Sequence, residues 1–245
     1  MLRMFHSEWI KLRKTVLWLV AGVGPAAAAL AAGLGLTLNA GTGNAFPWLE
    51  ALSIMAVLHG MLFLPLLTGV YAAVICRYEH TGGGWKQLLS LPVSRTQVYI
   101  VKLLCVAGLV AWTQALFLGV LLLVGAVKGA GGTIPWEMLL RSAAGGWVAC
   151  LPLAALQLAV SAAWPSFAAP LAVNVIFTLP NMLVANSAAY APYYPWAQPM
   201  LAMIPRETYT FGAFSLPPFT LFVVILGSFA VFFAAGWGYF ARRAL

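Results

Sequence analysis

Side chains that could carry chemistry are few and scattered in this sequence. The three histidines stand at positions 6, 59 and 80, and no H-E-x-x-H pair occurs that would bring two of them to one face of a helix around zinc. The cysteines Cys76, Cys105 and Cys150 lie in or beside apolar runs without C-x-x-C spacing, which favours packing residues over a metal cluster or a disulfide framework. We therefore predict no metal and no catalytic residue in this chain.

Two short patterns resemble enzyme motifs without completing them. The run Gly82-Gly83-Gly84-Trp85-Lys86 is glycine-rich and basic, but it has neither the G-x-x-x-x-G-K-[ST] spacing nor the final hydroxyl of a phosphate-binding loop. We expect no nucleotide cofactor in this chain. Glu137 and Arg141 have the spacing of an intramembrane protease motif, but the preceding residue is tryptophan and the necessary histidines are missing. An intramembrane enzyme is the least favoured alternative.

Four polar residues interrupt long apolar runs. They are His59, Gln114, Gln157 and Asn174. Such side chains within a membrane line a path for a substrate or ion, or they form hydrogen bonds between helices. The sequence leaves both uses open.

The composition indicates a membrane protein. Of the 245 residues, 63% are hydrophobic and only 7% are charged, against about 45–50% and about 25% in soluble domains. Apolar runs of about 20 residues, enough to cross a bilayer, recur along the chain. We predict one all-α integral membrane domain with six membrane-spanning helices, over about 15–38, 51–76, 97–126, 137–162, 167–185 and 217–240. The first run resembles a signal peptide but continues too far, so we expect an uncleaved span.

The distribution of charge predicts the orientation. The net charge of +8 would suggest a nucleic-acid partner in a soluble protein, but in a membrane protein the location of each charge matters more. With both termini in the cytoplasm, ten Lys and Arg fall on the inner side and three on the outer side. This asymmetry predicts a multi-pass membrane protein with cytoplasmic termini and no nucleic-acid partner.

Residues 1–14 have the pattern of an amphipathic helix. Leu2, Phe5, Trp9 and Leu12 share one helical face, and the basic residues lie largely on others. This pattern predicts a helix lying in the inner headgroup layer. Alternatively, the charges serve only to orient the first span.

The segment 77–96 is predicted to lie outside the bilayer and to be ordered. Its four charged residues disfavour the hydrocarbon. We expect a break at the three glycines, a short helix over residues 85–91 with Trp85, Leu88 and Leu89 on one face, and a stop at Pro92. Ser94 and Gln97 have the spacing of a capping box that opens the next helix. Such a helix docks on a cytoplasmic partner, or it rests on the inner leaflet with Trp85 as its anchor.

The passage 79–102 resembles the first cytoplasmic loop of type-2 ABC exporter permeases. The shared pattern is an acid, a glycine turn, a Leu-Leu pair, Pro-x-Ser-Arg and a lysine entering the next helix, and residues 8–14 resemble the start of the same group. Within it the chain is most similar to the lantibiotic-immunity and bacitracin-resistance type. The resemblance implies that residues 77–96 form a coupling helix seated on a separate ATPase. The positions carried over are Glu79, Gly84, Leu88, Leu89, Pro92, Ser94, Arg95 and Lys102, with Trp85 beside them.

The same resemblance implies the function and the partners. We expect a permease that exports an amphipathic antimicrobial peptide or a related membrane-active drug, with two copies of an ATPase, which carry ATP and Mg, and a second permease, identical or paralogous. An ion-gradient-driven carrier is the alternative, but its coupling acid is missing because all five acids fall at predicted span ends or in loops. The aromatic segment 186–216 is predicted to be extracellular, as an exit lid or as an interface belt.

Overall fold

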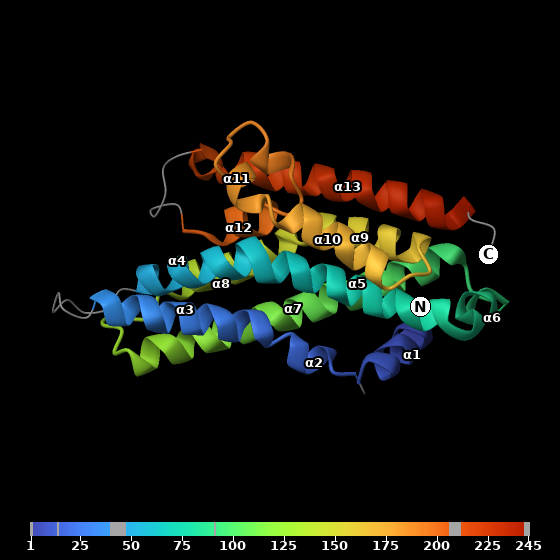
Figure 1. Ribbon diagram of the computed structural model, residues 1–245, viewed down its shortest axis with the longest axis horizontal. Coiled ribbons are helices and arrows are strands. Elements are labelled where there is room, and N and C mark those ends of the chain that lie inside the picture. Colours follow the sequence, from blue (N-terminus) through green and yellow to red (C-terminus); the bar gives the residue numbers. More distant parts are fainter. Residues whose placement is uncertain (1, 14, 40–47, 91, 206–211, 243–245) are drawn as a thin grey trace.

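The computed structural model describes residues 2–13, 15–39, 48–90, 92–205 and 212–242, and the fold is 84% helical with no strand among these residues. Figure 1 shows an elongated bundle of helices that run roughly parallel to its long axis. The first half of the chain forms α1 (Leu2–Arg13), α2 (Leu17–Val20), α3 (Val23–Asn39), α4 (Trp48–Leu58), the π-helix η2 (His59–Phe63), α5 (Leu64–His80), the 3₁₀ turn η3 (Thr81–Gly83), α6 (Gly84–Ser90) and α7 (Arg95–Val127).

The second half contains shorter helices before the last long one. They are α8 (Trp136–Ala149), α9 (Leu151–Ala163), α10 (Ala168–Thr178), α11 (Asn181–Ala185), η4 (Ala191–Tyr193), α12 (Gln198–Met203), η5 (Gly212–Ser215) and α13 (Pro218–Arg242). Helix α9 packs against both α5 and α13, and α12 packs against α8. Helices α1, α6 and the end of α13 gather at one end of the bundle, which we call the α6 end (Figure 1).

Five helical stretches are long and apolar enough to cross a membrane: Leu17–Leu34, Trp48–His80, Arg95–Val127, Trp136–Ala163 and Pro218–Arg242. The ends of the last four lie within about one helical turn of the ends of predicted spans. Helix ends themselves are uncertain by one or two residues. The first predicted span, 15–38, is divided by a turn at Ala21 and Gly22. The described residues therefore form an all-helical membrane protein.

The predicted span over 167–185 is not confirmed as one long helix. Helix α10 ends at Thr178, and α11 begins only after Pro180. Proline lacks an N–H and disfavours helical geometry in the residue before it, which accounts for the interruption. The α10–α11 pair nevertheless carries the chain from the α6 end toward the other end of the bundle (Figure 1).

A side chain from another helix replaces the hydrogen bond that Pro65 removes. Because Pro65 has no N–H, the carbonyl of Met61 four residues earlier loses its helical partner. The side-chain amide Nδ2 of Asn181 donates to that carbonyl at 2.8 Å. A neighbouring helix thus completes the hydrogen bond that a proline within a membrane helix removes.

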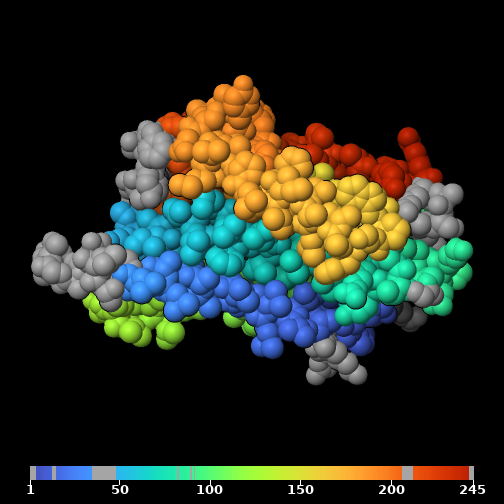
Figure 2. All heavy atoms as spheres, in the orientation of Figure 1, coloured from blue at the N-terminus to red at the C-terminus, as the bar shows by residue number. Residues whose placement is uncertain are grey.

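The segment before α13 folds onto the bundle. Trp196, Gln198 and Leu201 are buried, whereas Tyr190 and Tyr193 are exposed. Figure 2 shows the orange part of this segment standing out from the side of the bundle. Tyr209 and Phe211 of the predicted aromatic segment lie outside the described residues. The described part therefore combines a packed core with exposed tyrosines, and the choice between lid and belt stays open.

Candidate functional site

The α5–α6 junction is built by local hydrogen bonds and one close backbone approach. The Thr81 hydroxyl donates to the carbonyls of Arg77 and Tyr78, each at 3.1 Å, which caps α5. Gly83 has φ of +74°, a left-handed conformation that glycine adopts without strain. A Cβ on Gly84 would lie 2.9 Å from the Cα of Glu79. Glycine at 84 therefore lets α6 turn back against the end of α5.

Helix α5 continues to His80, so residues 77–80 are helical and not part of the predicted loop. After the glycines, α6 covers residues 84–90 and ends before Pro92, close to the expected 85–91. Ser94 caps α7, because its hydroxyl accepts from the Gln97 N–H at 3.2 Å while the Gln97 side chain accepts from the Ser94 N–H at 3.4 Å. The predicted capping box is confirmed.

Trp85 points into the bundle. It is 6% exposed, its indole Nε1 donates to Nδ1 of His80 at 3.2 Å, and its ring lies 5.3 Å from that of Phe240. Leu88 is half-buried against the same core, and the side chain of Leu89 lies outside the described part. The expectation that Trp85 and Leu88 face a partner is not supported by this packing, because both side chains attach α6 to its own bundle.

The outer surface of α6 is polar. Lys86, Gln87 and Ser90 are exposed, as is Pro92 just after the helix. Arg95, also predicted to contact the ATPase, is half-buried, and its Nη1 donates to the carbonyl of Ala241 at 3.1 Å. A partner that approaches α6 therefore meets Lys86, Gln87 and Ser90 first.

Four charged side chains meet behind α6, and we call them the charged cluster: Glu8, Lys11, Glu79 and Lys102. The Lys102 ammonium lies 3.1 Å from Glu8 and 3.2 Å from Glu79. The Lys11 ammonium contacts the same two carboxylates at 2.7 and 2.9 Å. Two acids and two lysines balance, so the charged cluster is neutral. It joins α1, α5 and α7.

The charged cluster is largely withdrawn from solvent. Glu8 and Glu79 are each 5% exposed and Lys102 is 1% exposed, and the Lys102 ammonium also lies 5.4 Å from the centre of a Trp85 ring. Lys11 is the most exposed member. Burial lowers the pKa of Lys11, but hydrogen bonds and attraction to Glu8 and Glu79 outweigh it, so the pKa is raised. Removing one partner from a buried ion pair costs about 3–5 kcal/mol, because the other charge is left uncompensated.

The predicted substrate-path residues form two separate pairs. The Nε2 of His59 lies 3.2 Å from Oε1 of Gln114, and the imidazole stacks on Phe117. Elsewhere, the Gln157 amide donates to Oδ1 of Asn174 at 3.1 Å, and Nδ2 of Asn174 donates to the carbonyl of Pro65 at 3.1 Å.

All four of these side chains are buried, and each pair bridges different helices. Gly69 makes room for Asn174, because a Cβ there would lie 2.1 Å from the Asn174 amide. These contacts are the hydrogen bonds between helices that the sequence left open as one alternative. His59 begins the π-helix η2, a local widening that is frequent at functional sites.

The described residues include no group of three or more His, Cys, Asp or Glu side chains that could hold a metal ion. The model of one family, described as ABC-2 family transporter protein, matches residues 4–181, well over half of the chain. The chain belongs to the ABC-2 transporter family. A search of the curated proteins gives no match. The match includes α1 from Met4 onward, α6 and all four residues of the charged cluster.

Membership of the ABC-2 family makes this chain a membrane permease, the transport subunit of an ABC transporter. The family also implies a partnership with an ABC ATPase. The lantibiotic-immunity branch and the substrate are not decided by this match.

Sequence reasoning missed the roles of Glu8 and Lys11 in this permease. Residues 8–14 were noted for their resemblance to the family, but not as partners of Glu79 and Lys102. One signal was present: Glu79 and Lys102 are opposite charges near adjoining ends of two long apolar runs, where an unpaired charge is costly. An acid and a lysine three residues apart in an amphipathic helix supply the matching pair.

Proposed function

We propose that this chain is the permease subunit of an ATP-driven exporter and that it expels an amphipathic antimicrobial peptide or a related membrane-active compound. Two ATPase subunits and a second permease, identical or paralogous, complete the transporter, with ATP and Mg on the ATPase. The peptide substrate is proposed from the sequence resemblance. Membership of the ABC-2 family supports the dependence on a separate ATPase.

The observation that carries this proposal is the attachment of α6. Its inner face is fixed to the bundle by Trp85, and its outer face is polar and open. Behind it, the charged cluster joins α5 and α7 to α1. A push on α6 is therefore transmitted to three helices at once, because packed side chains and buried ion pairs resist separation.

We therefore propose separate roles for the residues at the α6 end. Lys86, Gln87 and Ser90, which the sequence did not single out, form the surface that the ATPase contacts. Trp85, Glu79 and Lys102 act behind this surface and pass the displacement of α6 to the membrane-spanning helices. Gly84, Ser94 and Arg95 set the position of α6 between α5 and α7.

We further propose a cytoplasmic location for the α6 end, in a bacterial plasma membrane. Helix α1 and the end of α13 both lie there (Figure 1). With five long helices, this requires one more crossing, which the α10–α11 pair makes. The excess of Lys and Arg predicted for the cytoplasmic side supports this orientation.

The dependence of efflux on ATP tests the proposal directly. The permease should be expressed in a sensitive bacterial cell with its ATPase, and resistance to the antimicrobial peptide nisin should be measured together with efflux of a fluorescent nisin derivative. We expect efflux to stop when ATP is depleted and to continue when only the proton gradient is collapsed. Efflux that survives ATP depletion and stops with the gradient would identify an ion-driven carrier. ATP-dependent efflux of other amphipathic peptides, but not nisin, would correct the substrate alone.

A further inference from the structure

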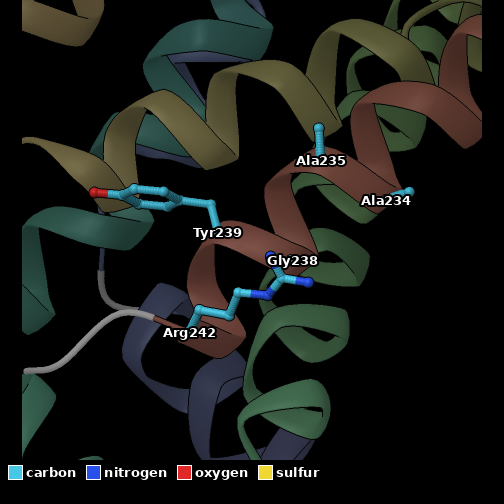
Figure 3. Close-up of a pocket in the computed structure, with 5 residues that line it drawn as sticks. All are labelled: Ala234, Ala235, Gly238, Tyr239 and Arg242. Atoms are coloured by element: carbon cyan, nitrogen blue, oxygen red, sulfur yellow. The ribbon is translucent and has the colours of Figure 1, made fainter.

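A shallow open groove runs along the outer face of α13 near its C-terminal end. It is lined by Ala234, Ala235, Gly238, Tyr239 and Arg242. Figure 3 shows the Arg242 side chain turned back along the helix toward Gly238, with Tyr239 pointing away on the other side. The other three lining residues are glycine and alanine. This surface of small apolar residues suits a flexible hydrocarbon chain.

The bundle leaves this face of α13 uncovered. The opposite face is packed: Phe240 is 2% exposed, and a Cβ on Gly236 would lie 2.2 Å from the hydroxyl of Tyr99. By contrast, a Cβ on Gly238 would meet no atom within 4 Å. The groove therefore opens toward the surroundings of the bundle, which for a membrane-spanning helix are lipids.

The groove ends where lipid headgroups are expected. Trp237 and Tyr239 are 40% and 47% exposed, and the Trp237 indole donates to the Thr96 hydroxyl at 2.9 Å. Exposed Trp and Tyr near the end of a membrane-spanning helix are typical of the boundary between hydrocarbon and headgroups. Arg242 follows Trp237 by five residues, so we expect its guanidinium at the level of the headgroup phosphates.

The charge at this end favours an anion. Arg242 is exposed, and none of the five lining residues is acidic. Arg95 brings a second guanidinium close by, because its Nη1 donates to the carbonyl of Ala241. A guanidinium offers paired donors that match a phosphate, and basic pockets at membrane surfaces bind anionic headgroups.

We propose that this groove binds one anionic phospholipid of the leaflet that surrounds α1 and α6. Its headgroup phosphate lies on Arg242, and one acyl chain lies over Gly238 and Ala234. The bound lipid would cover the side of α13 that is opposite Tyr99 and Phe240. This site is separate from the outer surface of α6, where we place the ATPase.

The test measures lipid binding to the detergent-solubilised permease by native mass spectrometry. Phosphatidylglycerol and phosphatidylcholine with the same acyl chains serve as probes. Arg242→Gln removes the charge, and its matched control is Arg141→Gln, which removes an exposed arginine elsewhere. Gly238→Leu fills the groove, and its control is Gly227→Leu, at another α13 glycine where a Cβ would meet nothing within 4 Å.

We expect phosphatidylglycerol to bind the unmodified chain at least about tenfold more tightly than phosphatidylcholine, because both lipids carry the phosphate but the choline cation of phosphatidylcholine cancels its charge. Arg242→Gln should abolish this preference, and Gly238→Leu should weaken binding of both lipids, while both controls bind normally. Equal binding of the two lipids, or equal losses in each variant and its control, would overturn the proposal. A Gly238→Leu variant that loses a second copy of the chain and keeps its lipid would show that a subunit interface occupies the groove.

Discussion

Replacing Lys102 with methionine should destabilise this permease more than any other single loss of charge at the α6 end. Methionine keeps the length of the side chain and removes only the ammonium. Glu8 and Glu79 would then share Lys11 alone, and one buried negative charge would stay uncompensated. The expected cost is about 3–5 kcal/mol. Restoring neutrality in the double variant Lys102→Met with Glu79→Gln should recover most of this loss.

Thermal unfolding in detergent measures this effect. Cys76, Cys105 and Cys150 are free and buried, so a thiol-reactive fluorophore reports their exposure as the chain unfolds. Lys128→Met is the matched control, because Lys128 is exposed at the other end of α7. A Lys102→Met variant as stable as Lys128→Met would show that no buried charge is left uncompensated. Failure of the double variant to regain stability would contradict charge balance as the cause of the loss.

Three further results are expected. Trp85→Ala should cost about 3–5 kcal/mol through lost packing against Phe240, and it should lower stimulation of the partner's ATP hydrolysis; unchanged stimulation would contradict the transmitting role of Trp85. Asn174→Leu should cost about 1–3 kcal/mol for each buried partner left unsatisfied, namely the Gln157 amide and the Trp196 indole N–H that donate to its Oδ1, and thermal unfolding that matches the unmodified chain would contradict this. The pKa of Lys11 is raised above 10.5 in the folded chain. Its contribution to the free energy of unfolding is therefore fully present below pH 10.5, and it is lost as the pH rises through the pKa of the folded state. The difference in melting temperature between the unmodified chain and Lys11→Gln should therefore stay constant from about pH 7 to 9, and a difference that shrinks in that range would contradict the pairing.

Local patterns in the sequence predicted local structure well. Long apolar runs located the second, third, fourth and last membrane helices, because a helix that crosses lipid must be apolar along about 20 residues. The capping box of Ser94 and Gln97 was predictable because both partners lie within one turn. The helix before Pro92 was predictable for the same reason.

Contacts between distant residues were not predictable in the same way. The direction of Trp85 depends on Phe240, which lies on the last helix, and on the turn that Gly84 allows. Glu8 and Lys102 are 94 residues apart, and no local pattern pairs them. The family resemblance implied that Glu79 and Lys102 couple to a partner, whereas the structure shows them in contact with each other within the chain.

The broken span over 167–185 illustrates a third limit. Its composition suits a membrane helix, and Pro180 alone would permit a kinked one. The break is stabilised by Asn181, whose amide bridges the Met61 carbonyl on another helix and the Trp196 carbonyl, each at 2.8 Å. Hydropathy averages over a window cannot detect such a side chain, because one asparagine changes the mean only slightly.

The outer surface of α6 is the proposed contact for the ATPase. Co-purification of the ATPase with permease variants, together with its rate of ATP hydrolysis, tests this contact. We expect that Lys86→Glu with Ser90→Glu loses the ATPase while the permease keeps its melting temperature, and that Arg141→Glu keeps both. Normal ATPase association in the Lys86 and Ser90 double variant would show that the ATPase binds elsewhere.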